Sequence, residues 1–136
     1  MRKVVLAVVV VLAALAGVLV IDRTSVQSTR ILGMLGMAVG FPLLIVSRLN
    51  LGRAFALTPQ AKALVTGGVY ARVPHPLYAF LDLALLGLIV ALRIPWLVAV
   101  WLALVAVHAC VARREARVLE AAFGDEYRRY RAQTWW

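Results

Sequence analysis

The sequence has few of the side chains that most soluble enzymes use for chemistry. Its 136 residues include one cysteine, two histidines and six acidic residues. A lone cysteine, Cys110 in an apolar run, excludes a disulfide framework, and no two potential metal ligands show the spacing of a metal site. The few serines all lie in the first 47 residues and outside any nucleophile elbow. Gly67-Gly68 alone does not make a phosphate-binding loop. Metal-dependent, serine-triad and conventional nucleotide enzymes are therefore disfavoured.

Long apolar runs dominate the chain instead. The composition is 64% hydrophobic and 15% charged, with a mean hydropathy of +0.91. Four runs stand out, at residues 4–21, 31–46, 77–92 and 94–112. A membrane-spanning helix needs roughly 20 residues, with about 17–25 tolerated. We therefore expect an all-α membrane protein with about four transmembrane helices. Residues 1–136 would form one integral membrane domain, divided into an N-terminal helical pair (1–48) and a core (49–136).

The net charge of +9 is distributed in a way that indicates orientation in a membrane. If the N-terminus is cytoplasmic and each run crosses once, 12 of the 15 basic residues fall on the cytoplasmic side. We therefore expect a lipid bilayer as the partner and no nucleic acid. The expected location is the cytoplasmic (inner) membrane, with several crossings, both termini cytoplasmic and the first helix retained.

Glycine and proline mark how the helices should meet. Gly36 and Gly40 form a GxxxG pattern, which favours close packing within the chain, and Pro42 should kink or loosen that helix. Pro76 suits the first turn of a helix starting near Leu77. A break at Arg93-Ile94-Pro95 predicts an antiparallel helical hairpin whose two open ends meet at one face.

A cytoplasmic amphipathic helix is expected after residue 112. Leu119, Phe123, Tyr127 and Tyr130 recur at helical spacing and would form one stripe on the membrane or over the mouth of the hairpin. Gly124 should kink or end the first half of that helix.

Polar and aromatic residues gather at the predicted mouth of the hairpin. Tyr70, His75, Tyr78 and Glu115 would surround one opening, with Gln60 nearby. Aromatic rings and a carboxylate suit a cationic, polar ligand. Asp82 and His108 lie inside apolar runs, where ionisable groups are costly and are candidates for function.

Three stretches carry a resemblance to a known family. They are Leu64-Val65-Thr66-Gly67-Gly68-Val69-Tyr70, then His75-Pro76-Leu77-Tyr78, and a segment with Glu115, Leu119, Phe123-Gly124, Tyr127 and Tyr130. Together they resemble the isoprenylcysteine carboxyl methyltransferase family, integral membrane enzymes that use S-adenosylmethionine. The resemblance covers about residues 51–130. It implies a cofactor site made by Gln60, Leu64, Val65, Tyr70, His75, Pro76, Leu77, Tyr78 and Glu115.

The resemblance implies methyl transfer from S-adenosylmethionine to a lipophilic acceptor. The first expectation is a carboxylate such as an isoprenylcysteine-like group, held by Arg113 or Arg114. Methylation of a carboxylate needs no general base. Three alternatives stay open: a phospholipid amine or a thiol as acceptor, a nicotinamide cofactor as in membrane sterol reductases, and an inactive membrane scaffold. Pro74, Phe80 and Ala116 depart from the family pattern, where Arg, Gly and a second Glu are usual.

Overall fold

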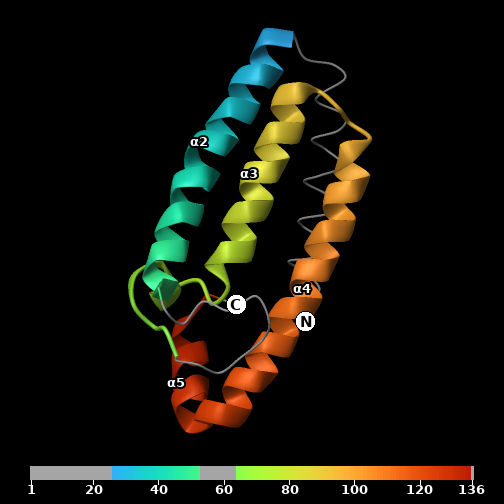
Figure 1. The fold of residues 1–136 in the computed structure, drawn as a ribbon. Helices are drawn as coiled ribbons and strands as arrows, with labels where there is room; N and C mark the ends of the chain where they lie inside the picture. The colour runs from blue at the N-terminus through green and yellow to red at the C-terminus, as the bar shows by residue number, and fades with distance from the viewer. Residues whose placement is uncertain (1–25, 53–63, 136) are drawn as a thin grey trace.

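The computed structural model describes residues 26–52 and 64–135, and every regular element in those ranges is helical. The elements are α2 (Val26–Leu51), the 3-10 helix η2 (Gly68–Ala71), α3 (Pro76–Leu92), α4 (Leu97–Phe123) and α5 (Asp125–Gln133) (Figure 1). α2 and α4 are long and apolar enough to cross a membrane, whereas α3 has 17 residues. The helical class is confirmed for the described residues. The predicted first helix, residues 4–21, lies outside them.

α2 is longer than the apolar run that predicts it. The helix covers 26 residues and continues through Pro42 to Leu51, so the expected boundaries of 31–46 were too narrow. Two buried hydroxyls bond to the helix's own carbonyls: Thr29 Oγ1 donates to Val26 O at 3.1 Å, and Ser47 Oγ donates to Leu43 O at 2.7 Å. Because these polar groups are satisfied within the helix, they can lie among apolar neighbours.

Glycines set the contact between α2 and α3, which lie side by side in Figure 1. A Cβ added to Gly40 would lie 2.7 Å from Ala84 N, and one added to Gly87 would lie 2.7 Å from Met37 N. A Cβ on Gly33 would lie 2.6 Å from Gly87 O. Backbone atoms therefore fill the space that a side chain would need. The prediction that the GxxxG segment packs within the chain is confirmed.

A short turn joins α3 to α4, which run in opposite directions (Figure 1). α3 begins at Pro76, as predicted, and ends at Arg93 in the left-handed conformation (φ 55°). α4 begins at Leu97 and not at residue 94, because the carbonyls of Ile94 and Pro95 accept turn hydrogen bonds from the amides of residues 97 and 98. Ile89, Val98 and Trp101 form a buried apolar cluster beside this turn.

Gly124 divides the C-terminal segment into two helices. Its φ of 50° and ψ of −118° end α4 at Phe123, far beyond the predicted end of the apolar run at residue 112, and start α5. The predicted break at Gly124 is confirmed, and the last two tyrosines of the predicted stripe lie on a separate helix, α5. Tyr127 and Tyr130 are buried there, and Tyr130 Oη donates a 2.8 Å hydrogen bond to Tyr70 O. α5 is thereby attached to the segment before α3.

Candidate functional site

A close contact between an imidazole and a carboxylate joins the start of α3 to the polar part of α4. His75 Nδ1 lies 3.3 Å from Glu115 Oε2, and the two side chains are 16% and 32% exposed. His75 is the N-cap residue of α3, immediately before Pro76. The structure thus brings together the two ionisable residues that the sequence places at one mouth.

A second polar pair lies deeper between the same helices. His108 Nδ1 is 2.8 Å from Asp82 Oδ1, and each side chain is 14% exposed. Trp101 Nε1 donates a 2.9 Å hydrogen bond to the backbone carbonyl of Asp82. A carboxylate that accepts from Nδ1–H orients the imidazole and leaves Nε2 with its lone pair. Asp82 therefore fixes the orientation of the His108 ring, with Nε2 as the ring nitrogen that does not contact the carboxylate.

Tyr78 connects the two pairs. Its ring stacks on His108, with centroids 5.2 Å apart and planes at 27°, and its centroid lies 6.2 Å from that of His75. Glu115, His75, Tyr78, His108 and Asp82 therefore form one continuous polar and aromatic cluster, which we call the α3–α4 cluster. In each of the two pairs, one residue belongs to α3 or its N-cap and the other belongs to α4.

The numbering explains why these residues meet, and it holds a signal that sequence reasoning missed. His75 and Glu115 are each 20 residues from Pro95, and Asp82 and His108 are each 13 residues from it. In antiparallel helices joined by a short turn, residues equally far from the turn lie at the same height. Asp82 and His108 were singled out separately, whereas equal distances from the turn would have predicted their pairing.

Two buried tyrosines border the cluster and stay protonated. Burial raises the pKa of the Tyr70 phenol well above its usual value, and the nearby Glu115 carboxylate adds to that rise. Burial also raises the pKa of Tyr130 to about 12. Both phenols are therefore hydrogen-bond donors at neutral pH, and Tyr130 uses its proton on Tyr70 O.

The remaining predicted site residues are not members of the α3–α4 cluster. Leu64, Val65 and Leu77 are half-buried and Pro76 is buried, all on the segment that leads into α3. Gln60 lies outside the described residues. Arg113 and Arg114 are exposed on α4, and neither forms an ion pair with another described residue.

The departures from the family pattern also have definite places. Pro74 is buried immediately before His75. Arg72, the nearest arginine, is exposed, and its backbone carbonyl accepts a 3.0 Å hydrogen bond from Trp135 N.

Two long apolar helices and a polar cluster between α3 and α4 define a membrane-associated helical protein with a partly enclosed polar site. A family model described as phospholipid methyltransferase matches residues 28–126. The chain therefore belongs to the phospholipid methyltransferase family, a family of membrane methyltransferases. No curated protein and no solved structure matches it significantly. The isoprenylcysteine carboxyl methyltransferase family belongs to the same superfamily, but the family model that matches is that of the phospholipid methyltransferases.

The chemistry of the cluster fits S-adenosylmethionine, the cofactor of this family. A carboxylate (Glu115) can accept from the cofactor's hydroxyl or ammonium groups and is exposed enough to be reached. Aromatic faces at Tyr78 and Tyr70 suit a sulfonium cation. The residues present therefore fit the group.

Proposed function

We propose that this protein transfers a methyl group from S-adenosylmethionine to the amine of a phospholipid headgroup at the membrane surface. The observation that carries the proposal is the Asp82–His108 pair, 2.8 Å apart in the same cluster as His75 and Glu115. The family assignment supplies the reaction class, and this pair supplies what an amine acceptor needs.

The cofactor would be held at the outer end of the cluster. Glu115, oriented by His75, would accept hydrogen bonds from its polar groups, while Tyr70 and Tyr78 contribute aromatic faces. Leu64, Val65, Pro76 and Leu77 would form the walls, with Gln60 as a further polar contact. When bound, the cofactor supplies an electrophilic methyl group on a positively charged sulfur.

An amine acceptor requires a base. An alkyl ammonium such as that of lysine has a pKa of roughly 10.4, so at neutral pH it must lose a proton before its lone pair can attack. His108 would take that proton on Nε2, with Asp82 holding the imidazole through Nδ1. The amine nitrogen would then accept the methyl group, and the demethylated cofactor would leave as a neutral thioether. Alignment of the two groups and exclusion of water contribute the rest.

The same proposal places the protein in the bilayer. We propose several membrane crossings in the inner membrane, with both termini and the polar end of α4 on the cytoplasmic side. A lipophilic acceptor would then reach the cluster laterally from the lipid. Reporter fusions at the two ends of α4 test this, because only the fusion after Phe123 should report a cytoplasmic location.

A carboxylate acceptor is the second candidate. The sequence resemblance implies an isoprenylcysteine-like group, and the observation that favours it is the exposed Arg113-Arg114 pair at the end of the apolar part of α4. Arginine binds carboxylates in a bidentate manner. A carboxylate is already ionised, so this reaction would not depend on His108.

Isotopically labelled S-adenosylmethionine distinguishes the two acceptors. Purified protein in nanodiscs should transfer label to phosphatidylethanolamine and not to a farnesylcysteine analogue. Transfer to the analogue alone would favour the carboxylate, and transfer to neither would count against both.

Cofactor binding is tested separately by isothermal titration of the detergent-purified protein. Glu115→Gln should weaken binding about tenfold or more, since hydrogen bonds to a charged group contribute about 1.5–3 kcal/mol each. Glu126→Gln is the matched control, because Glu126 is exposed on α5 and outside the cluster. Equal binding by the two variants would contradict the proposed cofactor site.

A further inference from the structure

An arginine-lined groove lies between α4 and α5, apart from the α3–α4 cluster. It is open to the surface and has a volume of about 510 Å³. Its polar lining consists of Arg113, Arg117, Glu120, Tyr127, Arg128 and Arg131. Four guanidinium groups thus face one groove that contains a single carboxylate.

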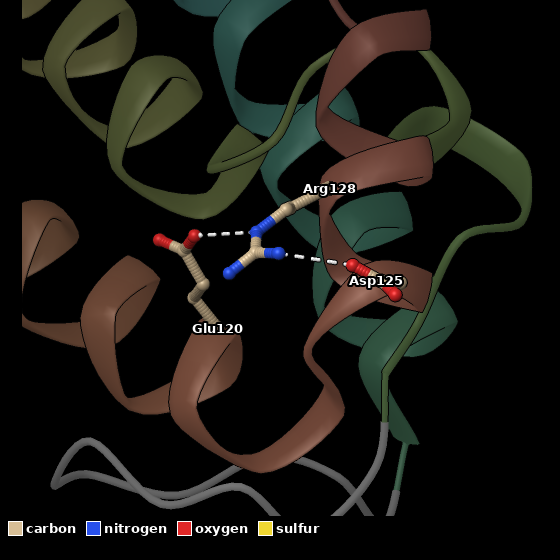
Figure 2. Close-up of polar contacts among 3 residues, drawn as sticks. All are labelled: Glu120, Asp125 and Arg128. Atoms are coloured by element: carbon tan, nitrogen blue, oxygen red, sulfur yellow. Dashed lines mark hydrogen bonds and ion pairs between the residues drawn. The ribbon is translucent and has the colours of Figure 1, made fainter.

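That carboxylate is already engaged. Arg128 Nε donates to Glu120 Oε1 at 3.0 Å, and Arg128 Nη1 donates to Asp125 Oδ1 at 2.9 Å (Figure 2). Within the described residues, the other three arginines of the groove form no ion pair. Arg113 and Arg117 are also one turn apart on α4, a spacing at which like charges repel. The groove therefore has uncompensated positive charge.

Tyr127 provides an independent sign of a ligand. Its side chain is 4% exposed, yet its hydroxyl has no hydrogen-bond partner in the part of the chain that the structure describes. A buried hydroxyl without a partner is costly. Burial raises the pKa of this phenol, so it carries a proton that it can donate. An anion in the groove would accept a hydrogen bond from this hydroxyl.

The groove and the α3–α4 cluster occupy different sides of α4. Successive residues of an α-helix are about 100° apart, so Arg113 and Arg117, each two residues from Glu115, point about 160° away from it. Arg113 is also the first charged residue after the apolar stretch of α4. This is the depth at which the phosphate groups of a bilayer lie when such a helix spans it.

We propose that the α4–α5 groove binds the phosphate of an anionic phospholipid, at a site separate from the methyl-transfer site. The guanidinium groups that form no ion pair, of which Arg117 and Arg131 each make one 3.4 Å hydrogen bond, and the Tyr127 hydroxyl would donate to the phosphate oxygens. A zwitterionic headgroup fits less well, because its cationic group would lie next to arginines. Among the described residues, the only carboxylate of the groove lining, Glu120, is already paired with Arg128. The bound lipid would hold α5 at the membrane surface. This proposal does not depend on the proposed reaction.

Binding of a fluorescent-acyl phosphatidylglycerol to the full chain in detergent tests the proposal. Unlabelled phosphatidylglycerol should displace the probe, with phosphatidylcholine at least tenfold less effective. Arg117→Gln/Arg131→Gln should weaken binding at least tenfold. The matched control, Arg114→Gln/Arg129→Gln, removes the same charge from the same two helices outside the groove and should change binding less than twofold.

Tyr127→Phe provides a second test if the groove double variant does not fold. It removes the hydroxyl donor, keeps the ring and should weaken binding severalfold at an unchanged melting temperature. Equal loss in both double variants, equal displacement by phosphatidylcholine, or unchanged binding by Tyr127→Phe would overturn the proposal. Displacement by inorganic phosphate at the same concentrations as the lipid would overturn the assignment to a phospholipid.

Discussion

The two sides of α3 are built in opposite ways. Toward α2, small residues let the backbones approach, and a Cβ on Gly87 would lie 2.7 Å from Met37 N. Toward α4, polar side chains meet across the helices, as in the pairs His75–Glu115 and Asp82–His108. At its glycines the α2 side has no room for a side chain, whereas the α4 side has ionisable groups that remain partly exposed.

This difference separates support from chemistry. Close backbone packing leaves α2 and α3 few alternative positions, so α3 can hold Asp82 and Tyr78 at a constant place. The contact with α4 can then include ionisable groups near the membrane, because each of them has a partner or is partly exposed, which lowers the free-energy cost of burying it. We therefore expect changes on the α4 side to alter activity and changes on the α2 side to alter stability.

The largest expected effect is on activity, from His108→Gln. Glutamine can still donate to Asp82 but cannot accept a proton, so kcat for phosphatidylethanolamine should fall about 100-fold, as for loss of a general base. The affinity for S-adenosylmethionine and the melting temperature should stay close to those of the wild type. An unchanged kcat would show that the Asp82–His108 pair is structural.

Gly87→Ala should produce the largest loss of stability. The added methyl group would collide with the backbone of α2, and overpacking of this kind costs about 1–3 kcal/mol. Thermal unfolding in detergent measures the loss. Gly67→Ala is the control, because Gly67 has a negative φ and nothing within 4 Å of an added Cβ. Similar melting temperatures for the two variants would contradict the rigid α2–α3 contact.

Tyr130→Phe tests whether α5 belongs to the stable part of the molecule. It leaves the buried carbonyl of Tyr70 without its 2.8 Å donor and should cost about 1–2 kcal/mol of unfolding free energy. Tyr127→Phe removes a hydroxyl that has no partner among the described residues and should leave stability nearly unchanged. If both variants unfold alike, the Tyr130–Tyr70 bond does not attach α5.

A smaller effect is expected at alkaline pH. The pKa of Tyr130 is about 12 in the folded protein and about 10 when exposed. Below pH 10 the phenol is protonated in both states, so it adds no pH dependence. Between pH 10 and about 12 only the unfolded state loses the proton, and stability should fall as the pH rises. Tyr130→Phe should show a shallower fall in melting temperature over that range.

Much of the α3–α4 cluster could be predicted from the sequence because it depends on how many residues separate each side chain from the turn at Pro95. Pro76 opens α3, and a short turn reverses the chain near Pro95. His75 and Glu115 must then lie at the same height, and the structure places them 3.3 Å apart. The Asp82–His108 pair, 2.8 Å apart, follows from the same geometry.

The α4–α5 groove could not be predicted in this way. The sequence indicated a break at Gly124, but its φ of 50° and ψ of −118° set the direction that α5 takes. With a straight helix, Arg131 would lie about four turns beyond Arg117. The course of α5 after Gly124 places both at one groove, which the buried Tyr127 also lines.

The sequence alone determined that the described chain is helical, that its glycines pack within the chain, and that polar residues meet where α3 starts. These properties depend on composition and on spacing along single helices. The tertiary structure decided which ionisable groups lie within contact of each other, and which arginines line the α4–α5 groove. Those outcomes depend on the angle of one turn and the contact of two backbones, which residue spacing does not specify.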